Sequence, residues 1–379
     1  MERADHETRK PMIRLGAGAA IPALLRGFGL EPAAFFHERG FDVARFEDPD
    51  LPVAYAALAE LASGAADATG CEHFGLLVGH AADLRTLGGI GLEAARAPNA
   101  GAALRLIAAR FDAHDRGAIV TFDEAEDVSL SYSVIDPAVV SAGTMVDGAM
   151  AAAMRIMTEL CGPSFAPSAV CLPRRAPRDR RPYARAFRCR VSFDAPTARM
   201  HFDRRWLSLP LRRQARMPSA SADGRLPPIM QGDPIVRVRV EIGRRLATGG
   251  EVSVASVAQA LGMSRRTLHR ELAKGCTTYH SIVDDVRFAF AKRLLHDTGM
   301  SLTEIAVELG YSELSAFTRA FARFFGACPS AWRGRHGLSP FGVTSATRSP
   351  DPSRPPLFPN RHETSSEGAP FERRSVAGP

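Results

Sequence analysis

Hydrogen-bond donors gather directly after two turns of similar sequence. The segments VASVAQALGMS (254–264) and LTEIAVELGYS (302–312) match position by position at an offset of 48 residues. The residues that follow them carry guanidinium, imidazole and hydroxyl groups. Such groups bond to base edges and phosphates when a rigid element holds them on its outer face.

Both segments predict a helix, a sharp turn and a second helix. A small residue inside the first helix allows close approach of the second, and glycine after leucine can adopt the left-handed conformation that ends a helix. A serine then closes each turn, where its hydroxyl can cap the next helix and donate to a phosphate. These shared residues are Ala258 and Ala306, Leu261-Gly262 and Leu309-Gly310, and Ser264 and Ser312.

The helices after the two serines are amphipathic. Leu268 and Leu272 share one face of the first, and Phe317 and Phe321 share one face of the second. A bundle with arginines on a solvated face would explain one such helix, but two copies in register favour nucleic-acid binding. The predicted DNA-contacting residues are Ser264, Arg265, Arg266, His269 and Arg270 in the first copy, and Ser312, Leu314, Ser315, Thr318 and Arg319 in the second.

A single helix is expected between the two copies. In YHSIVDDVRFAFAKRLLH, 279–296, apolar residues recur at steps of three and four. Such a helix spans roughly 27 Å, and successive major grooves on one DNA face lie about 34 Å apart. We therefore expect one chain to place two recognition helices in two successive major grooves of double-stranded DNA.

With these motifs in view, residues 235–333 resemble the AraC/XylS-type transcription regulators, the family of the arabinose regulator. The resemblance rests on SRRTLHREL from Ser264, on R-x-x-x-A-x-x-L-L from Arg287, and on IAVELGYSELSAFTRAFARFFGACPSAWR from Ile305. One departure is Cys328, where serine or threonine is more usual; it weakens capping of the last helix.

The resemblance implies base contacts from Arg266, His269 and Arg270. Leu314, Ser315, Thr318 and Arg319 occupy the matching places in the second copy. Leucine and serine offer little bidentate bonding to a base pair. We therefore expect the first unit to supply more sequence discrimination than the second.

The residues before position 212 predict a mixed α+β domain. Helical spacing of apolar residues covers 52–66, with Pro52 in the first turn, and also 100–111 and 145–160. Strand-like segments at 118–122 and 128–135 flank an acidic turn and predict a hairpin with one buried face, and further strands are expected at 169–172 and 199–202. The predicted organisation is a disordered start (1–11), the α+β domain (12–211), a linker (212–233), an all-α DNA-binding domain (234–335) and a disordered tail (336–379).

This α+β domain also resembles a known one, the effector domain that a subset of these regulators carries under an arabinose-binding label. The matching features are Asp48-Pro49-Asp50, Gly75-Leu76, Leu87-Gly88-Gly89-Ile90-Gly91, Ala97-Pro98, Tyr132, FRCRVSFDA from Phe187 and HFDRRWLSLPL from His201. The name of this domain does not imply that it binds a sugar. The resemblance implies a small-molecule effector, but it assigns no ligand-binding residues.

The composition and the absence of known motifs argue against several other classes of protein. The net charge of +7 suits a nucleic-acid partner, although arginine dominates it and only three lysines occur. No hydrolase, metalloprotease, phosphate-loop or dinucleotide motif is present, so we expect no enzyme activity, no catalytic residues and no cofactor. The six cysteines form no zinc pattern, which predicts no metal site and reduced, mostly buried thiols. We interpret His73, His80 and His114 as structural or surface residues, and Gly88 to Gly91 as a tightly packed turn.

The expected partners follow from the class. We predict a regulator in the bacterial cytosol and nucleoid, without a membrane segment, that forms a homodimer and contacts RNA polymerase if it acts as an activator. A metabolite bound to the α+β domain would then change how the DNA-binding domains are presented. The alternative is a regulator whose α+β domain only dimerises or contacts another protein.

Overall fold

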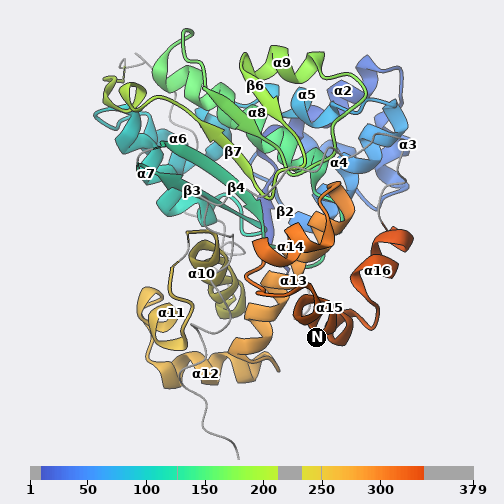
Figure 1. Ribbon diagram of the computed structural model, residues 1–379. Coiled ribbons are helices and arrows are strands. Elements are labelled where there is room, and N and C mark those ends of the chain that lie inside the picture. Colours follow the sequence, from blue (N-terminus) through green and yellow to red (C-terminus); the bar gives the residue numbers. More distant parts are fainter. Residues whose placement is uncertain (1–9, 126, 212–232, 249, 337–379) are drawn as a thin grey trace, which may run out of the picture.

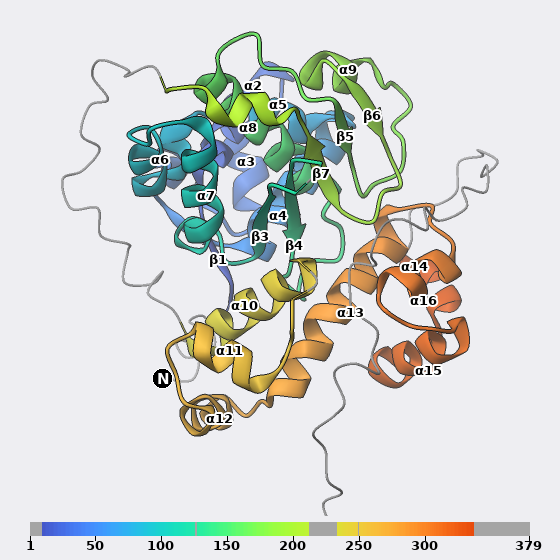
Figure 2. The same cartoon turned by 60° about the vertical axis from the view of Figure 1, so that its left-hand side comes forward.

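The computed structural model describes residues 10–125, 127–211, 233–248 and 250–336 (Figure 1). Most of the predicted start, linker and tail lies outside the described residues. Within the described part, a sheet with its helices occupies one end of the molecule and a group of helices occupies the other (Figures 1 and 2).

Five strands form the main sheet in the order β3-β4-β7-β5-β6, and all neighbours are antiparallel except the parallel pair β5-β6. The predicted hairpin is confirmed, with Ala118 opposite Val134 and Asp123 opposite Ser129. The strands expected near 169–172 and 199–202 are also present. The bounds are β3 Ala118–Asp123, β4 Ser129–Val134, β5 Ala169–Cys171, β6 Arg190–Ser192 and β7 Ala198–His201.

Helices pack against this sheet and against one another. The α-helices are α2 Ile21–Gly27, α3 Pro32–His37, α4 Tyr55–Thr69, α5 Phe74–His80, α6 Gly89–Ala94, α7 Ala100–Arg110, α8 Gly143–Cys161 and α9 Arg181–Phe187. Short 3-10 turns are η1 Gly16–Ala20, η2 Val43–Glu47, η3 Leu84–Leu87, η4 Phe111–Ala113 and η5 Arg204–Ser208. The helices predicted at 100–111 and 145–160 thus correspond to α7 and α8, and the mixed α+β class is confirmed.

Two local predictions for this domain are wrong. Residues Pro52–Ala54 form strand β2, which pairs with β1 (Met12–Arg14), and helix α4 begins only at Tyr55. Pro52 therefore stands at the end of a strand, where its missing N–H breaks no ladder. The hairpin also has no exposed face along β4, whose six residues are all buried. The reason is that β4 lies between β3 and β7 while helix α8 covers it.

Helices α5 and α8 approach closely because they carry glycines where they cross. A Cβ on Gly75 would collide with the carbonyl oxygen of Thr144, and one on Gly79 with that of Gly148. This contact fixes one wall of the domain interior. Gly88 and Gly91 are likewise packed tightly, against Arg14 and Leu84, as expected for that turn.

The second group of helices comprises α10 Pro234–Thr248, α11 Val254–Ala260, α12 Arg265–Lys274, α13 Tyr279–Asp297, α14 Leu302–Glu308, α15 Leu314–Phe325 and α16 Pro329–His336. Both helix-turn-helix units and the single helix between them are therefore confirmed. The core of this group includes Ile119 and Ile135 from the sheet domain. Helix α10 packs against β3, and a Cβ on its Gly243 would lie 2.8 Å from Ile135. The two halves thus share apolar packing.

None of the helices in the described ranges is long and apolar enough to cross a bilayer. The six cysteines are all free. Cys71 and Cys161 are buried, Cys276 is exposed and the other three are half-buried, so the expectation of mostly buried thiols is wrong.

Candidate functional site

The first helix-turn-helix forms as its sequence predicts. Helix α11 is capped by Ser253, and Gly262, with φ of +67°, turns the chain after it. The Ser264 hydroxyl then accepts a hydrogen bond of 3.0 Å from the Thr267 amide and caps α12. Ala258 is buried where the two helices meet. Local sequence therefore fixes the direction in which α12 leaves the turn.

Helix α12 buries its leucines and exposes its basic residues. Leu268 and Leu272 are buried in the core. All five predicted contact residues of this copy are exposed: Ser264, Arg265, Arg266, His269 and Arg270. Glu271 lies beside them and pairs with Arg270 and Lys274. The outer face of α12 is thus strongly basic, with one carboxylate at its edge.

The second unit differs at its turn. Gly310 has φ of +76°, and the buried Ala306 repeats the role of Ala258. However, α15 begins one residue later than the repeat predicts, and Glu313 occupies the position before it without a side-chain cap. The prediction that Ser312 caps this helix is therefore wrong. The Ser315 hydroxyl instead donates to Glu313 Oε2 over 2.9 Å.

Aromatic packing holds α15 in place. Phe317 and Phe321 are fully buried. The Phe321 ring lies 6.2 Å from Phe288 on α13 and 6.2 Å from Trp332 on α16. Of the predicted contact residues in this copy, Ser312, Leu314, Ser315 and Arg319 are exposed and Thr318 is half-buried.

Helix α13 joins the two units without a break. Its 19 residues begin after Thr278, whose side chain accepts from the Ser281 amide, and span about 28 Å. Both α12 and α15 lie at the end of the molecule away from the sheet, on either side of α13 (Figures 1 and 2). One surface of the protein therefore presents both recognition helices.

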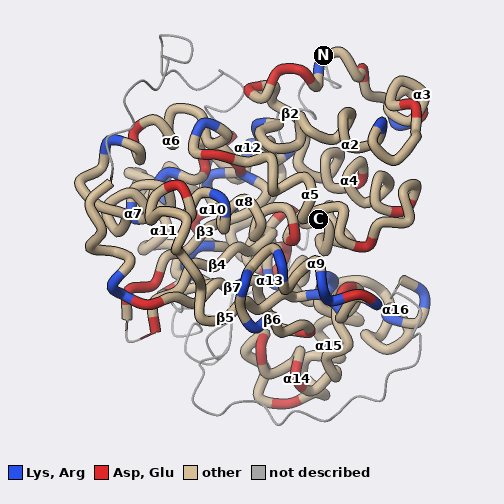
Figure 3. Tube along the Cα trace, turned by 90° about the horizontal axis from the view of Figure 1, so that it is seen from above, with Lys and Arg blue, Asp and Glu red and all other residues tan. Residues whose placement is uncertain are grey.

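Charge is distributed unequally over the two units. The first carries Arg265, Arg266, Arg270 and Lys274 against Glu271. In the second, the acidic residues of α14 (red in Figure 3) lie close to α15, and Glu313 precedes it. A polyanion is therefore attracted more strongly by the first unit.

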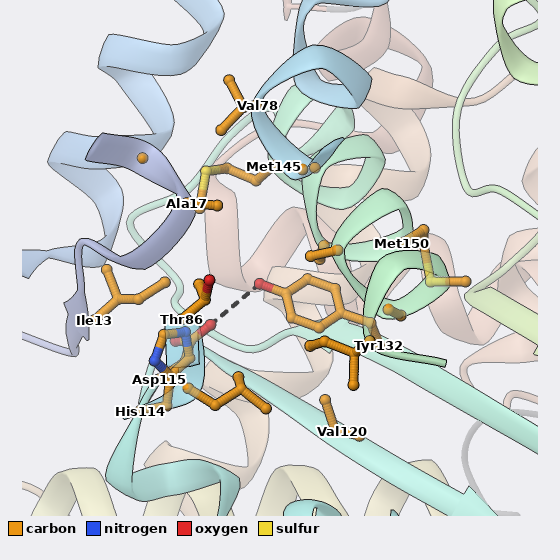
Figure 4. A pocket seen from close by; sticks show the side chains of 18 of the residues that line it. Ile13, Ala17, Val78, Thr86, His114, Asp115, Val120, Tyr132, Met145 and Met150 are labelled. Atoms are coloured by element: carbon orange, nitrogen blue, oxygen red, sulfur yellow. Dashed lines mark hydrogen bonds between the residues drawn. The ribbon is translucent and has the colours of Figure 1, made fainter. Parts of the chain in front are cut away.

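A cavity of about 150 Å³ lies inside the sheet domain (Figure 4). Helices α4, α5, α7 and α8 and strands β3 and β4 contribute to its lining, which is mainly aliphatic side chains and methionine. The polar side chains in the lining are Thr86, His114, Asp115, Ser131, Tyr132 and Thr144. The interior thus combines an apolar wall with one polar edge, where His114, Asp115 and Tyr132 meet.

Hydrogen bonds order this polar edge. Asp115 Oδ1 accepts from the Gly117 and Ala118 amides, at 2.8 and 3.1 Å. The Tyr132 hydroxyl donates to Asp115 Oδ2 over 3.2 Å and lies 2.8 Å from the Tyr55 hydroxyl. Burial raises the pKa of Asp115 to about 7, although these hydrogen bonds oppose the shift. Near neutral pH the carboxyl group is therefore protonated in a substantial fraction of molecules.

His114 is the second titratable group at this edge. Burial lowers its pKa to about 3, and the nearby Arg14 charge adds to the effect. Its ring is therefore neutral, and among the described residues its Nδ1 atom finds no hydrogen-bond partner. His114 is buried, which fits its interpretation as a structural residue, but no sequence pattern shows that it lines the cavity.

Polar contacts fasten α13 to the sheet domain. Arg293 donates to the carbonyl oxygens of Val134 and Asp136, and Lys292 donates to that of Pro137 over 2.6 Å. The carboxylate of Asp297 accepts from the Ser141 hydroxyl and the Ala142 amide, at 2.9 and 2.8 Å. Because Val134 is two residues from Tyr132, strand β4 carries both a cavity residue and a contact to the linker helix.

Known proteins share both halves of this arrangement. The family described as the arabinose-binding domain of AraC transcription regulators, N-terminal, matches residues 29–211. The family described as a helix-turn-helix domain matches residues 257–335. With the two exposed recognition helices, these matches define a DNA-binding transcription regulator. The chain belongs to the AraC family of such regulators and has an arabinose-binding-like N-terminal domain.

Two relatives and one solved structure are similar to this chain. The transcriptional regulator VirS of Mycobacterium tuberculosis is 26% identical over 321 residues, which cover 83% of this chain and 94% of that protein. The ornithine utilization regulator of Pseudomonas aeruginosa is 42% identical over 76 residues, 20% of this chain and 22% of that protein. The crystal structure of the transcriptional regulator CdpR from Pseudomonas aeruginosa aligns over 79% of this chain and 96% of its own, with 23% identity and a TM-score of 0.34.

Proposed function

We propose that this regulator reads an asymmetric DNA site across two successive major grooves, and that a small metabolite in the inner cavity controls the reading. The DNA part of the proposal rests on one observation: α12 and α15 project from the same end of the molecule and are joined by the unbroken helix α13. Because a rigid helix sets the distance between the two recognition helices, we expect the two halves of the DNA site to lie at one fixed spacing.

We assign most of the base discrimination to Arg266, His269 and Arg270. Arginine forms bidentate hydrogen bonds with guanine, and the ring of His269 offers a further donor or acceptor. Ser264 and Arg265 lie at the start of α12, where a hydroxyl and a guanidinium suit phosphates. The matching places in the second unit hold side chains with less capacity for bidentate hydrogen bonds, namely Ser312, Leu314, Ser315, Thr318 and Arg319.

Genome-wide mapping of bound sites, followed by footprinting on one of them, tests the DNA part. We expect protection over two major-groove segments on one face, separated by one helical turn. A footprint confined to a single major-groove segment would contradict the two-groove arrangement.

Control by a metabolite is supported by the path from the cavity to α13. Tyr132 lines the cavity, and the carbonyl of Val134 on the same strand accepts from Arg293 of the linker helix. A ligand that displaces Tyr132 would therefore act on a strand that also positions α13. Coupling of this kind requires that the ligand bind two arrangements with different affinities.

DNA affinity measured across a metabolite panel tests this part of the proposal. We expect at least one small molecule to change the affinity of the full-length protein for its site. If no metabolite has any effect, including products of neighbouring operons, the α+β domain only dimerises or contacts another protein.

Sedimentation of the free protein checks the proposed homodimer, and transcription with purified RNA polymerase distinguishes activation from repression.

A further inference from the structure

We propose that the inner cavity binds an uncharged molecule of about the size of a benzene ring that carries one hydroxyl group. The hydroxyl bonds at the polar edge of the cavity, where His114, Asp115 and Tyr132 meet. This proposal rests on metabolite control as proposed above and names the class of ligand for the same cavity.

The size of the ligand follows from the volume of the cavity. About 150 Å³ is free between the side chains. An engineered protein cavity of that volume, lined by aliphatic and aromatic side chains, stays dry and binds benzene. A single ring or a short branched chain therefore fits, whereas a nucleotide or a long acyl chain does not.

The wall of the cavity selects an apolar body. It is built from aliphatic and thioether side chains that offer no strong hydrogen bond, among them Ile13, Leu58, Leu104, Ile107, Met150 and Met157. Burying a hydrocarbon surface against them is favourable by roughly 25 cal/mol per Å². A sugar, whose hydroxyls need a partner on every side, would leave most of them unpaired.

The charges at the cavity favour a neutral ligand. The lining residues include no lysine or arginine, so a carboxylate ligand would be buried without a counter-ion and beside Asp115. An ammonium ligand would need an ionised Asp115, but burial raises the pKa of this carboxyl group to about 7, so below that pH it is mostly neutral. The free energy that either charged ligand loses on desolvation is therefore larger than the free energy it gains from contacts in the cavity.

The position of His114 supplies the polar anchor. The residue is 8% exposed, and its Nδ1 atom makes no hydrogen bond within the described part of the chain. Its ring is held between Phe111, at 5.6 Å between centroids, and Gly16, where a Cβ would lie 3.2 Å from it. The ring lines the cavity beside Asp115 and Tyr132, where a ligand hydroxyl, which can donate or accept, suits either tautomer of the imidazole.

Four probes of one size separate the alternatives: phenol, benzene, benzoate and benzylamine. We would measure their affinities for the full-length protein by calorimetry at pH 6, where Asp115 is mostly protonated while benzoate and benzylamine are still charged. We expect phenol to bind most tightly, benzene about tenfold more weakly, and the two charged probes not measurably. The tenfold factor corresponds to one net hydrogen bond.

Two variants locate the site. His114→Leu removes both ring nitrogens at similar side-chain volume, and we expect it to weaken the binding of phenol about tenfold while that of benzene changes less than twofold. Ala149→Leu, on the α8 wall, reduces the free volume and should weaken both probes. If His114→Leu does not fold, the Ala149→Leu result with the probe order still decides the question.

Each outcome bears on a defined claim. Tighter binding of benzoate or benzylamine than of phenol overturns the proposed ligand class, while metabolite control can still hold. Failure of phenol and benzene to bind the wild-type protein at millimolar concentrations overturns the inference. If phenol binds as expected but leaves DNA affinity unchanged, the ligand class stands and control of DNA binding through this cavity is refuted.

Discussion

Replacing Asp115 with asparagine should remove a large pH dependence from the stability of the protein. Asparagine keeps the shape of the side chain, and its amide oxygen can still accept from the Gly117 and Ala118 amides. The Tyr132 hydroxyl would then face the side-chain amide of the asparagine, and it can donate its hydrogen bond to the Tyr55 hydroxyl instead. We therefore expect the variant to fold and to differ from the wild type mainly in its titration.

The sign and size of the effect follow from the pKa of Asp115. Burial raises it to about 7 in the folded protein, against 3.8 for the free side chain, and the nearby Asp136 adds to the increase. Between these two pH values the folded state holds a proton that the unfolded state has released. Stability that is fully present below about pH 4 is therefore lost as the pH rises through 7. At 1.36 kcal/mol per pH unit, the total loss is about 4 kcal/mol.

Urea unfolding at pH values from 4 to 8 measures this difference. Trp206 lies in the sheet domain and Trp332 in the helical domain, so fluorescence reports on both. His114, whose pKa burial lowers to about 3, contributes with the opposite sign, but it is present in both proteins and cancels in the comparison. Ser131→Ala, which removes an uncharged hydroxyl group from the lining, is the matched control. It should change the free energy of unfolding by the same amount at every pH.

The reasoning predicts that wild type loses stability relative to Asp115→Asn by about 4 kcal/mol from pH 4 to pH 7 and then remains level. Parallel curves for the two proteins across this range would refute it. They would mean that Asp115 is ionised throughout in the folded protein, and that the polar edge of the cavity is charged.

Three further changes test the DNA interface and the domain contact. Arg270→Ala should cost about 1–3 kcal/mol on the bound site and relax the preference at one base pair in a competition assay; equal losses on random DNA would indicate a phosphate contact instead. Glu313→Gln removes an exposed carboxylate before α15 and should raise affinity for any DNA a few-fold at low salt, with the gain disappearing at high salt. Asp297→Ala leaves the amide of Ala142 unpaired and should lower the free energy of unfolding by about 2–3 kcal/mol, more than Ser141→Ala does.

The sequence predicted the DNA-binding half well because its signals are local. Leucine at steps of four, glycine after leucine and the Ser264 cap all act within one turn of helix. The cap predicted at Ser312 failed although the repeat is in register. There the turn contains Tyr311, which is buried and packs on Phe317, where the first copy has the half-buried Met263. The second helix thus begins later in the unit whose turn is packed against it.

The cavity could not be predicted in the same way. Ile13, Leu58, Leu104, Tyr132 and Met150 come from five elements far apart in the sequence, and each fits an ordinary core position. The same holds for the strand at Pro52, whose helical spacing was overridden by pairing with β1. Long-range contacts of this kind leave no periodic signal in the chain.

The contact between α13 and β4 also makes a thermodynamic demand on any control by a ligand. If phenol changes the affinity of the protein for its DNA site by some factor, saturating DNA must change the affinity for phenol by the same factor, because coupling between two sites is reciprocal. A ligand that binds only one of two arrangements stabilises it by about 2.7 kcal/mol at a hundred times its Kd, which is similar to the contribution expected above for the Asp297 carboxylate. Asp297→Ala should therefore reduce both factors together while phenol still binds. If Asp297→Ala leaves the two factors at their wild-type value, the cavity and the recognition helices are not coupled through this contact.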